Sequence, residues 1–123
     1  MLPIRTALVM GLLFAQSAGA AECLIADSDR PLVLSGIVEY RREAGQPGVS
    51  LILHLESPIC VRGVKFGGQQ FKREGISSIL LGIPAHLNKA PRDRERVVLR
   101  GKIGGPAIND PDEKLTFGLL EIL

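Results

Sequence analysis

The chain has 123 residues, with 15 lysines and arginines against 13 aspartates and glutamates, so its formal net charge is only +2. A charge this small gives no general attraction to nucleic acid or to an anionic membrane surface. Aromatic residues make up 4% of the chain and tryptophan is absent. The core must therefore be aliphatic, and single-stranded nucleic acid, which stacks its bases on aromatic side chains, is not an expected ligand.

The first 20 residues have the pattern of a bacterial secretory signal peptide. Arg5 precedes an apolar run over residues 7–15, and Ala18 and Ala20 form an A-x-A ending. The run is far shorter than the roughly 20 residues that span a bilayer. We therefore predict cleavage after Ala20 and export to the periplasm or the medium. A buried N-terminal helix is the alternative.

Residues 21–123 then form a single domain by length, and they contain both cysteines, Cys23 and Cys60. Two cysteines in an exported chain most simply form one disulfide. That bridge would close a loop of about 38 residues. Free thiols or a redox pair are the alternative, although no C-x-x-C motif is present. Lipidation of Cys23 is a further alternative, but Glu22 stands where a lipidation site has a small residue.

Residues 32–40 alternate between apolar and polar positions and predict the first strand. The turn sequence at residues 45–48 joins it to the most regular alternation in the chain, residues 49–56, so we expect an antiparallel hairpin. Pro58 is expected to end the second strand, because proline cannot donate to a sheet ladder. Residues 59–61 would continue as a short extended piece.

The second half of the chain predicts three more strands. Residues 62–75 are interrupted by two adjacent glycines and are interpreted as a loop or turn. Strands follow at residues 76–83, from about residue 96 to 103, and at residues 115–123. The proline-bracketed segment 85–90 has room for one helical turn. No long helical periodicity is present.

Two glycines help to choose among small β folds. Gly36 and Gly101 each follow a strand leucine by two positions and so point to the core side. A glycine there permits a sharp bend or a close backbone approach. About five strands with such bends predict an all-β domain, a small five-stranded OB-like barrel closed by one disulfide. A small β-sandwich or an SH3-like barrel is the alternative.

A basic stripe on the fourth predicted strand is the candidate contact surface. The cations of one parity are Arg92, Arg94, Arg96, Arg100 and Lys102. Those on the strand itself, Arg96, Arg100 and Lys102, are the predicted site residues for an acidic partner, a phosphate or a polyanion. The alternative is a solvated outer face, neutralised at its start by Asp93 and Glu95.

No catalytic, metal or cofactor site is predicted. His54 and His86 stand alone, without an acid or a cysteine at a metal-binding spacing. No G-x-S-x-G elbow or phosphate-binding loop is present. The acidic residues 109–113 lack the glycine and the terminal glutamate of a calcium loop.

Three segments resemble an uncharacterised family of small exported bacterial domains of unknown function. Residues 32–36 stand at its opening V-x-L-x-G strand, residues 58–61 match its P-I-C-V motif, and residues 97–101 match a late V-x-V-x-G strand. The resemblance covers residues 32–123, but a histidine-bearing segment near the family's end is missing here. It implies an OB-like fold and an envelope location, and it implies no activity.

The leading functional hypothesis is a non-enzymatic exported binding or adaptor domain. Its partner would be another envelope protein or a small ligand, with no nucleic acid, no cofactor and no membrane span in the mature chain. A small periplasmic enzyme whose residues converge only in three dimensions is one alternative. A structural subunit of an envelope assembly is the other.

Overall fold

The computed structural model describes residues 22–42, 44–45, 47–65, 67–106 and 114–123, and within these ranges the protein is all-β, without a helix. The predicted signal peptide and the acidic segment 109–113 lie outside the described residues. The strands are β1 (Leu24–Ile25), β2 (Leu32–Arg41), β3 (Ser50–Val64), β4 (Gln70–Gly82), β5 (Arg96–Gly104) and β6 (Thr116–Ile122).

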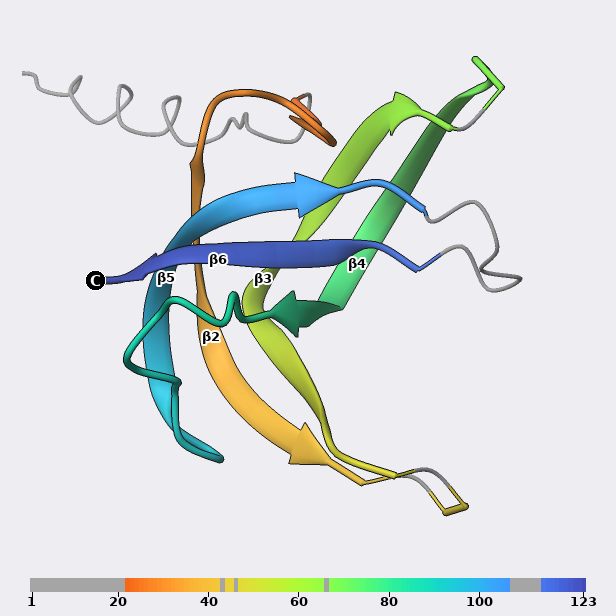
Figure 1. Cartoon of the computed structure of the whole chain (residues 1–123). Helices are drawn as coiled ribbons and strands as arrows, with labels where there is room; N and C mark the ends of the chain where they lie inside the picture. Colours follow the sequence, from red (N-terminus) through yellow and green to blue (C-terminus); the bar gives the residue numbers. More distant parts are fainter. Residues whose placement is uncertain (1–21, 43, 46, 66, 107–113) are drawn as a thin grey trace, which may run out of the picture.

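The five long strands pair in a ring. β2 pairs antiparallel with β3 and with β5, and β5 pairs antiparallel with β6. β6 runs parallel to β4, and β4 pairs antiparallel with β3, which closes the ring. Figure 1 shows β2 and β5 curving strongly as they pass around it. The predicted all-β class and the β2–β3 hairpin are confirmed.

The core fills the inside of the ring and is aliphatic apart from Phe117 among its fully buried side chains. Alternate residues of β2, β5 and β6 face inward, as the period of a strand requires. The largest fully buried side chains are Phe117, Leu53, Leu99, Ile103, Leu119, Val38 and Val61. The face of β5 that the sequence predicts to be apolar is therefore its core face.

Gly36 and Gly101 lie where bent strands come closest. A Cβ atom at Gly36 would stand 2.0 Å from the carbonyl oxygen of His54, and one at Gly101 would stand 2.3 Å from that of Gly118. No side chain fits at either distance. The sequence prediction that these glycines permit a close backbone approach on the core side is confirmed.

The predicted disulfide is present and fastens the N-terminal segment to β3. Cys23 and Cys60 are bonded, with their Cα atoms 4.5 Å apart. The next residues, Leu24 and Val61, are register partners where β1 runs parallel to β3. Beyond them the backbone N–H of Asp27 donates to the carbonyl of Ile103 at 2.7 Å, so the segment also bridges to β5.

Pro58 does not end a strand, contrary to the sequence prediction. β3 continues through it to Val64. The register between β3 and β4 shifts between His54 and Ile59, so Pro58 has no ladder partner on β4 and its missing N–H interrupts no hydrogen bond of that ladder. Proline is tolerated in strands at such irregularities.

Residues 70–74 form strand instead of the predicted loop, because their pairing with β3 and one apolar contact outweigh their polar composition. Phe71 packs against the core cluster and pairs with Gly63. The loop itself is confined to residues 65–69, where the N–H of Lys65 donates to the carbonyl of Gln69 at 2.7 Å. Residues 85–90 hold a turn, without a helix.

Replacing Cys60→Ser will lower the free energy of unfolding by about 4 kcal/mol in oxidising buffer, since the loop closed by the bridge is then free in the unfolded chain. Chemical denaturation measures this. Reductant should bring the unchanged protein down to the level of the double variant Cys23→Ser/Cys60→Ser and leave that variant unaffected. Equal stability of the oxidised protein and the double variant would contradict a stabilising bridge.

Gly36→Ala will destabilise the fold by more than about 2 kcal/mol, because the added methyl group collides with a backbone atom that cannot rotate away. Gly82→Ala is the matched control: it also lies in a strand, and its nearest neighbour would be 3.9 Å away. Thermal unfolding compares the two. Equal melting temperatures would show that β2 and β3 can separate at this crossing.

Candidate functional site

The predicted contact surface lies on the outer face of β5, and its two arginines are paired with acids of other strands, one of them across β2. Nη1 of Arg96 is 2.7 Å from Oε2 of Glu56 on β3. Nε of Arg100 is 3.0 Å from Oε1 of Glu121 on β6. Cross-strand ion pairs of this kind neutralise the basic stripe while holding the face together only weakly.

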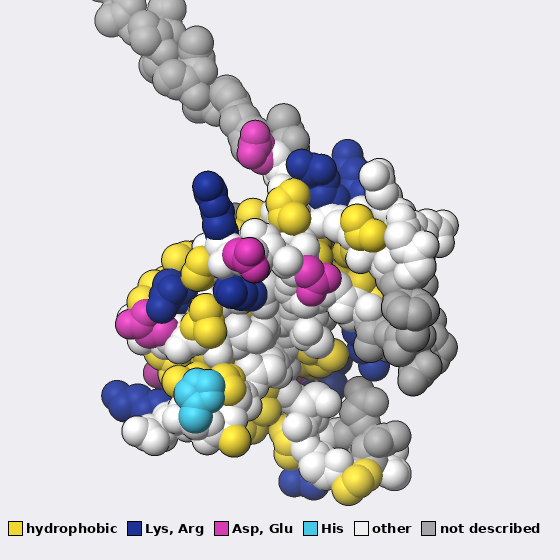
Figure 2. Space-filling model, turned by 45° about the horizontal axis from the view of Figure 1, so that its top comes forward, with side chains coloured by type: hydrophobic (Ala, Val, Ile, Leu, Met, Phe, Trp, Pro, Cys, Tyr) yellow, Lys and Arg dark blue, Asp and Glu magenta, His cyan; other side chains and the backbone are white. Residues whose placement is uncertain are grey.

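The rest of the stripe does not restore a basic surface. Arg92 and Arg94 precede β5 in a turn, where Arg94 has a φ of 67° and its Nε lies 4.0 Å from Asp93. Lys102 is exposed and borders an open apolar hollow that also touches His86. Figure 2 shows that on one face of the molecule basic, acidic and hydrophobic side chains are interspersed. The three predicted residues thus share a face without concentrating positive charge.

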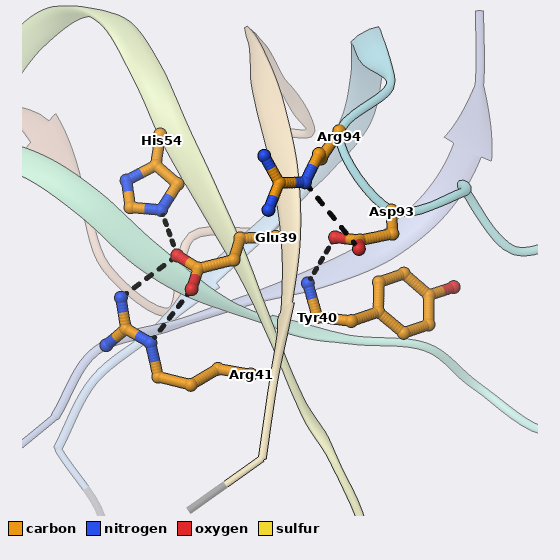
Figure 3. Close-up of polar contacts among 6 residues, drawn as sticks. All are labelled: Glu39, Tyr40, Arg41, His54, Asp93 and Arg94. Carbon is orange, nitrogen blue, oxygen red and sulfur yellow. Dashed lines mark hydrogen bonds and ion pairs between the residues drawn. The ribbon is translucent and has the colours of Figure 1, made fainter.

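Glu39 forms the centre of a second outer-face cluster, drawn in Figure 3. Its Oε1 is 2.6 Å from Nε2 of His54, and the guanidinium of Arg41 donates to both oxygens of the same carboxylate. Ser78 lies opposite His54 in the β3–β4 register. No hydrogen bond joins that serine to the histidine in the described structure, so the Glu39–His54 pair does not activate it as a nucleophile.

Asp93 and Tyr40, also in Figure 3, serve the fold. The N–H of Tyr40 donates to Oδ1 of Asp93 at 3.0 Å, and the Tyr40 hydroxyl donates to the carbonyl of Pro91. The N–H of Arg94 donates to the carbonyl of Val38 at 2.7 Å. These hydrogen bonds fasten the chain before β5 along the edge of β2. The contacts of Asp93 and Tyr40 are therefore explained by their role in holding the fold.

A groove of about 470 Å³ lies along β4, and sequence reasoning did not predict it. Its polar lining consists of three cations and three serines: Arg41, Arg73, Lys114, Ser50, Ser77 and Ser78. Among its apolar lining residues, Ile52 is 8% exposed although its parity puts it on the outer face of β3. We call this hollow the β4 groove.

The β4 groove draws on three parts of the chain. Arg41 and Ser50 flank the connection from β2 to β3, residues of β4 form one wall, and Lys114 follows the connection from β5 to β6. Within the described ranges, the lining residues include no aspartate or glutamate. Arg41 is held by Glu39, and the Arg73 guanidinium lies 5.7 Å from the centre of the Phe71 ring. Such a site can attract an anion and donate hydrogen bonds to it through serine hydroxyls.

The groove was missed because its cations are far apart in sequence. Arg41, Arg73 and Lys114 each lie in a different segment and belong to no motif. The only local signal is that Arg41 and Lys114 immediately flank connections, where binding residues gather on small β folds. Recognising the site required knowing that β4 and β6 are neighbours.

The histidines and acids form no metal centre within the described ranges. No three side chains among histidine, cysteine, aspartate and glutamate gather closely enough there to hold an ion. His54 and His86 lie on different elements, and each is solvent-exposed. No apolar helix of membrane-crossing length occurs in the same residues.

No protein-family model, curated protein or solved structure matches the chain. The resemblance carried by residues 32–36, 58–61 and 97–101 therefore stays a prediction. Function has to be argued from the geometry of the chain itself.

The pKa of Glu39 is lowered from 4.5 to about 2, first by the hydrogen bond from Arg41 and then by that from His54. The folded pKa lies below the unfolded one. The contact therefore adds stability above about pH 4.5, and that contribution is lost as the pH falls toward 2. Carboxyl NMR should show a Glu39 midpoint near 2 that moves upward in Arg41→Gln.

Arg42→Gln is the control for this titration, because it removes a neighbouring cation that makes no contact with Glu39 in the described structure. It should leave the midpoint unchanged. A Glu39 midpoint near 4.5 in the unchanged protein would mean that the contact does not persist in solution.

Proposed function

We propose that this protein is an exported, non-enzymatic binding or adaptor domain of the OB type, and that the β4 groove is its ligand site. The preferred ligand is anionic. The proposal takes this groove, in place of the outer face of β5, as the principal contact surface. Ion pairs do not decide between the two surfaces, because Arg41 in the groove is paired with Glu39 just as Arg96 and Arg100 are paired with Glu56 and Glu121. The choice rests on the hollow itself and on its position in the fold.

The order of strand pairing supports the OB assignment. Counted from β2, the ring runs first, second, third, fifth and fourth strand before returning to the first. The third and fifth strands of that count, β4 and β6, are parallel, and all other pairs in the ring are antiparallel. A sandwich would keep two separate sheets, which this ring of pairings disfavours. Five strands in one ring of pairings therefore favour the proposed OB fold, a five-stranded, partly open barrel.

The position of the groove is the observation that carries the functional proposal. OB folds bind ligands on the face of their second and third strands, between the loops that join strands one to two and four to five. In this count those strands are β3 and β4, and the loops follow β2 and β5. Arg41, Ser50 and Lys114 flank those two connections and line the groove.

Export is supported by the disulfide and by the pattern of residues 1–20. A disulfide persists in oxidising compartments such as the periplasm. The resemblance to an exported bacterial family agrees with this location and belongs to the proposal. The non-enzymatic interpretation rests on the solvent exposure of both histidines and on the Glu39 carboxylate, which contacts His54 but is also bound by Arg41.

Affinity capture from bacterial envelope extract tests the proposal with two variants of equal charge. The groove variant is Arg73→Gln/Lys114→Gln, and the matched control on the β5 face is Arg96→Gln/Arg100→Gln. We expect the groove variant to retain less than about a tenth of the captured partner, since each lost charged contact costs about 1.5–3 kcal/mol. The control should capture as the unchanged protein does, because its arginines are already neutralised.

Circular dichroism and melting temperature must first show that both variants fold. Loss of capture only in the β5-face variant would return the function to Arg96 and Arg100 and overturn the groove. Capture that is equal in all three proteins would remove both surfaces.

A further inference from the structure

The segment before β2 fills a gap in the ring that β2 itself leaves. β2 pairs with β3 only from Gly36 onward, although it pairs with β5 from Leu32 onward. Residues 23–27, which we call the strap, lie in the space between β3 and β5 that results. The strap runs parallel to β3 at Val61 and reaches β5 through a hydrogen bond to the carbonyl of Ile103.

The noncovalent contacts of the strap are modest in the described structure. Besides the two-residue ladder of β1, the N–H of Ala26 donates to the carbonyl of Arg62 at 2.9 Å and that of Asp27 to Ile103 at 2.7 Å. Ala26 is buried and Leu24 packs against the core in part. Asp27 has a φ of 60°, a left-handed conformation that is less favourable than the ordinary one. Because ordering each residue also costs conformational entropy, these contacts hold the strap weakly without the disulfide.

Cys60 lies at an irregularity between β3 and β4. The residues on either side of it pair with Ile76 and Arg73, so residues 74–75 of β4 both stand opposite this one cysteine. Two residues against one is the pattern of a β-bulge. A hollow of about 320 Å³ lies at the bulge, and Cys60 and Gly75 are among its lining residues. The half-buried bridge is therefore open to approach from the Cys60 side.

We propose that the Cys23–Cys60 bridge is a thiol–disulfide exchange site that controls the strap. A dithiol protein reduces the bridge through the hollow beside Cys60, and the strap then leaves the ring. The pairings among the five long strands do not involve residues 23–27, so the ring itself stays closed. The proposal goes beyond the binding function and does not depend on the β4 groove.

The exchange takes two displacements at sulfur. A thiolate of the dithiol attacks Sγ of Cys60, the S–S bond breaks, and its electron pair leaves with Sγ of Cys23, which takes a proton from water. The second thiol of the dithiol then displaces Cys60, so the reductant ends as a disulfide and the protein as two thiols. Cys60 stays on β3, whereas Cys23 departs with the strap.

Release of the strap changes one surface of the molecule. Val61 and Arg62 lose the partners that β1 gives them, and β3 then has a bare backbone edge there. An edge of this kind is a template for another strand. A Cβ atom at Gly63 would stand 3.0 Å from that of Ala26, so removal of Ala26 also uncovers the core beside β3. The oxidised and reduced proteins thus differ in a surface that only the reduced form exposes.

NMR spectroscopy of the 15N-labelled protein, purified oxidised after export in a bacterial host and then treated with dithiothreitol, tests the release of the strap. We expect the amides of Ala26 and Asp27 to move to random-coil shifts and to exchange with solvent at least about tenfold faster after reduction. The amides of Leu99 on β5 and Phe117 on β6 should keep their dispersed shifts.

The double variant Cys23→Ser/Cys60→Ser is the matched control. It should have a released strap from the start and should not respond to dithiothreitol. Unchanged shifts of Ala26 and Asp27 on reduction would overturn the proposal, because the strap would then stay without the bridge. Loss of dispersion throughout the spectrum would overturn it as well, because the bridge would then hold the whole ring.

A monothiol tests the point of attack. The oxidised protein is treated with 2-mercaptoethanol, quenched with acid at low conversion and mapped by peptide mass spectrometry. The mixed disulfide should form on Cys60 and leave Cys23 as a free thiol. A mixed disulfide formed chiefly on Cys23 would show that the hollow is not the route and would overturn the assigned mechanism.

Discussion

The closure of the ring depends on three residues at the end of β4. Leu80, Leu81 and Gly82 pair in parallel with β6, while the rest of β4 pairs, among the described residues, only with β3. This short contact joins the hairpin of β2 and β3 to the pair formed by β5 and β6, and the core fills the space between them. Because the contact is short, β4 and β6 separate beyond it, and the groove lies along β4 where they do.

Local sequence patterns predicted most of the fold because each pattern has a local cause. Alternation placed β2, β5 and β6 within a residue or two, and Gly36 and Gly101 marked the close approaches. The two failures, at Pro58 and at residues 70–74, have a common origin. Pro58 lies where the register between β3 and β4 shifts, whereas residues 70–73 pair in regular register with residues 61–64. In both places only the partner strand decides whether a proline or a polar run is tolerated.

The candidate site was less predictable than the fold. The stripe containing Arg96 and Arg100 was visible in the sequence because its members alternate along one strand. Their partners, Glu56 and Glu121, lie 40 and 21 residues away in the chain, so the ion pairs that neutralise the two arginines could not be predicted from the sequence. The cations of the β4 groove could not be predicted for a different reason, since no periodicity in the sequence links them. Charge along a strand is thus a poor guide to charge on a sheet, where neighbouring strands decide the sign.

The chain order of the ring has a consequence for the timing of folding. β6 follows the other described strands along the chain, yet it lies between β5 and β4, and the N–H of Leu123 just beyond it donates a hydrogen bond to the carbonyl of Val98. The ring cannot close before β6 has been synthesised. Its contacts are also mostly distant in sequence, which slows folding. A chain with this strand order stays open during synthesis until β6 has joined β5 and β4.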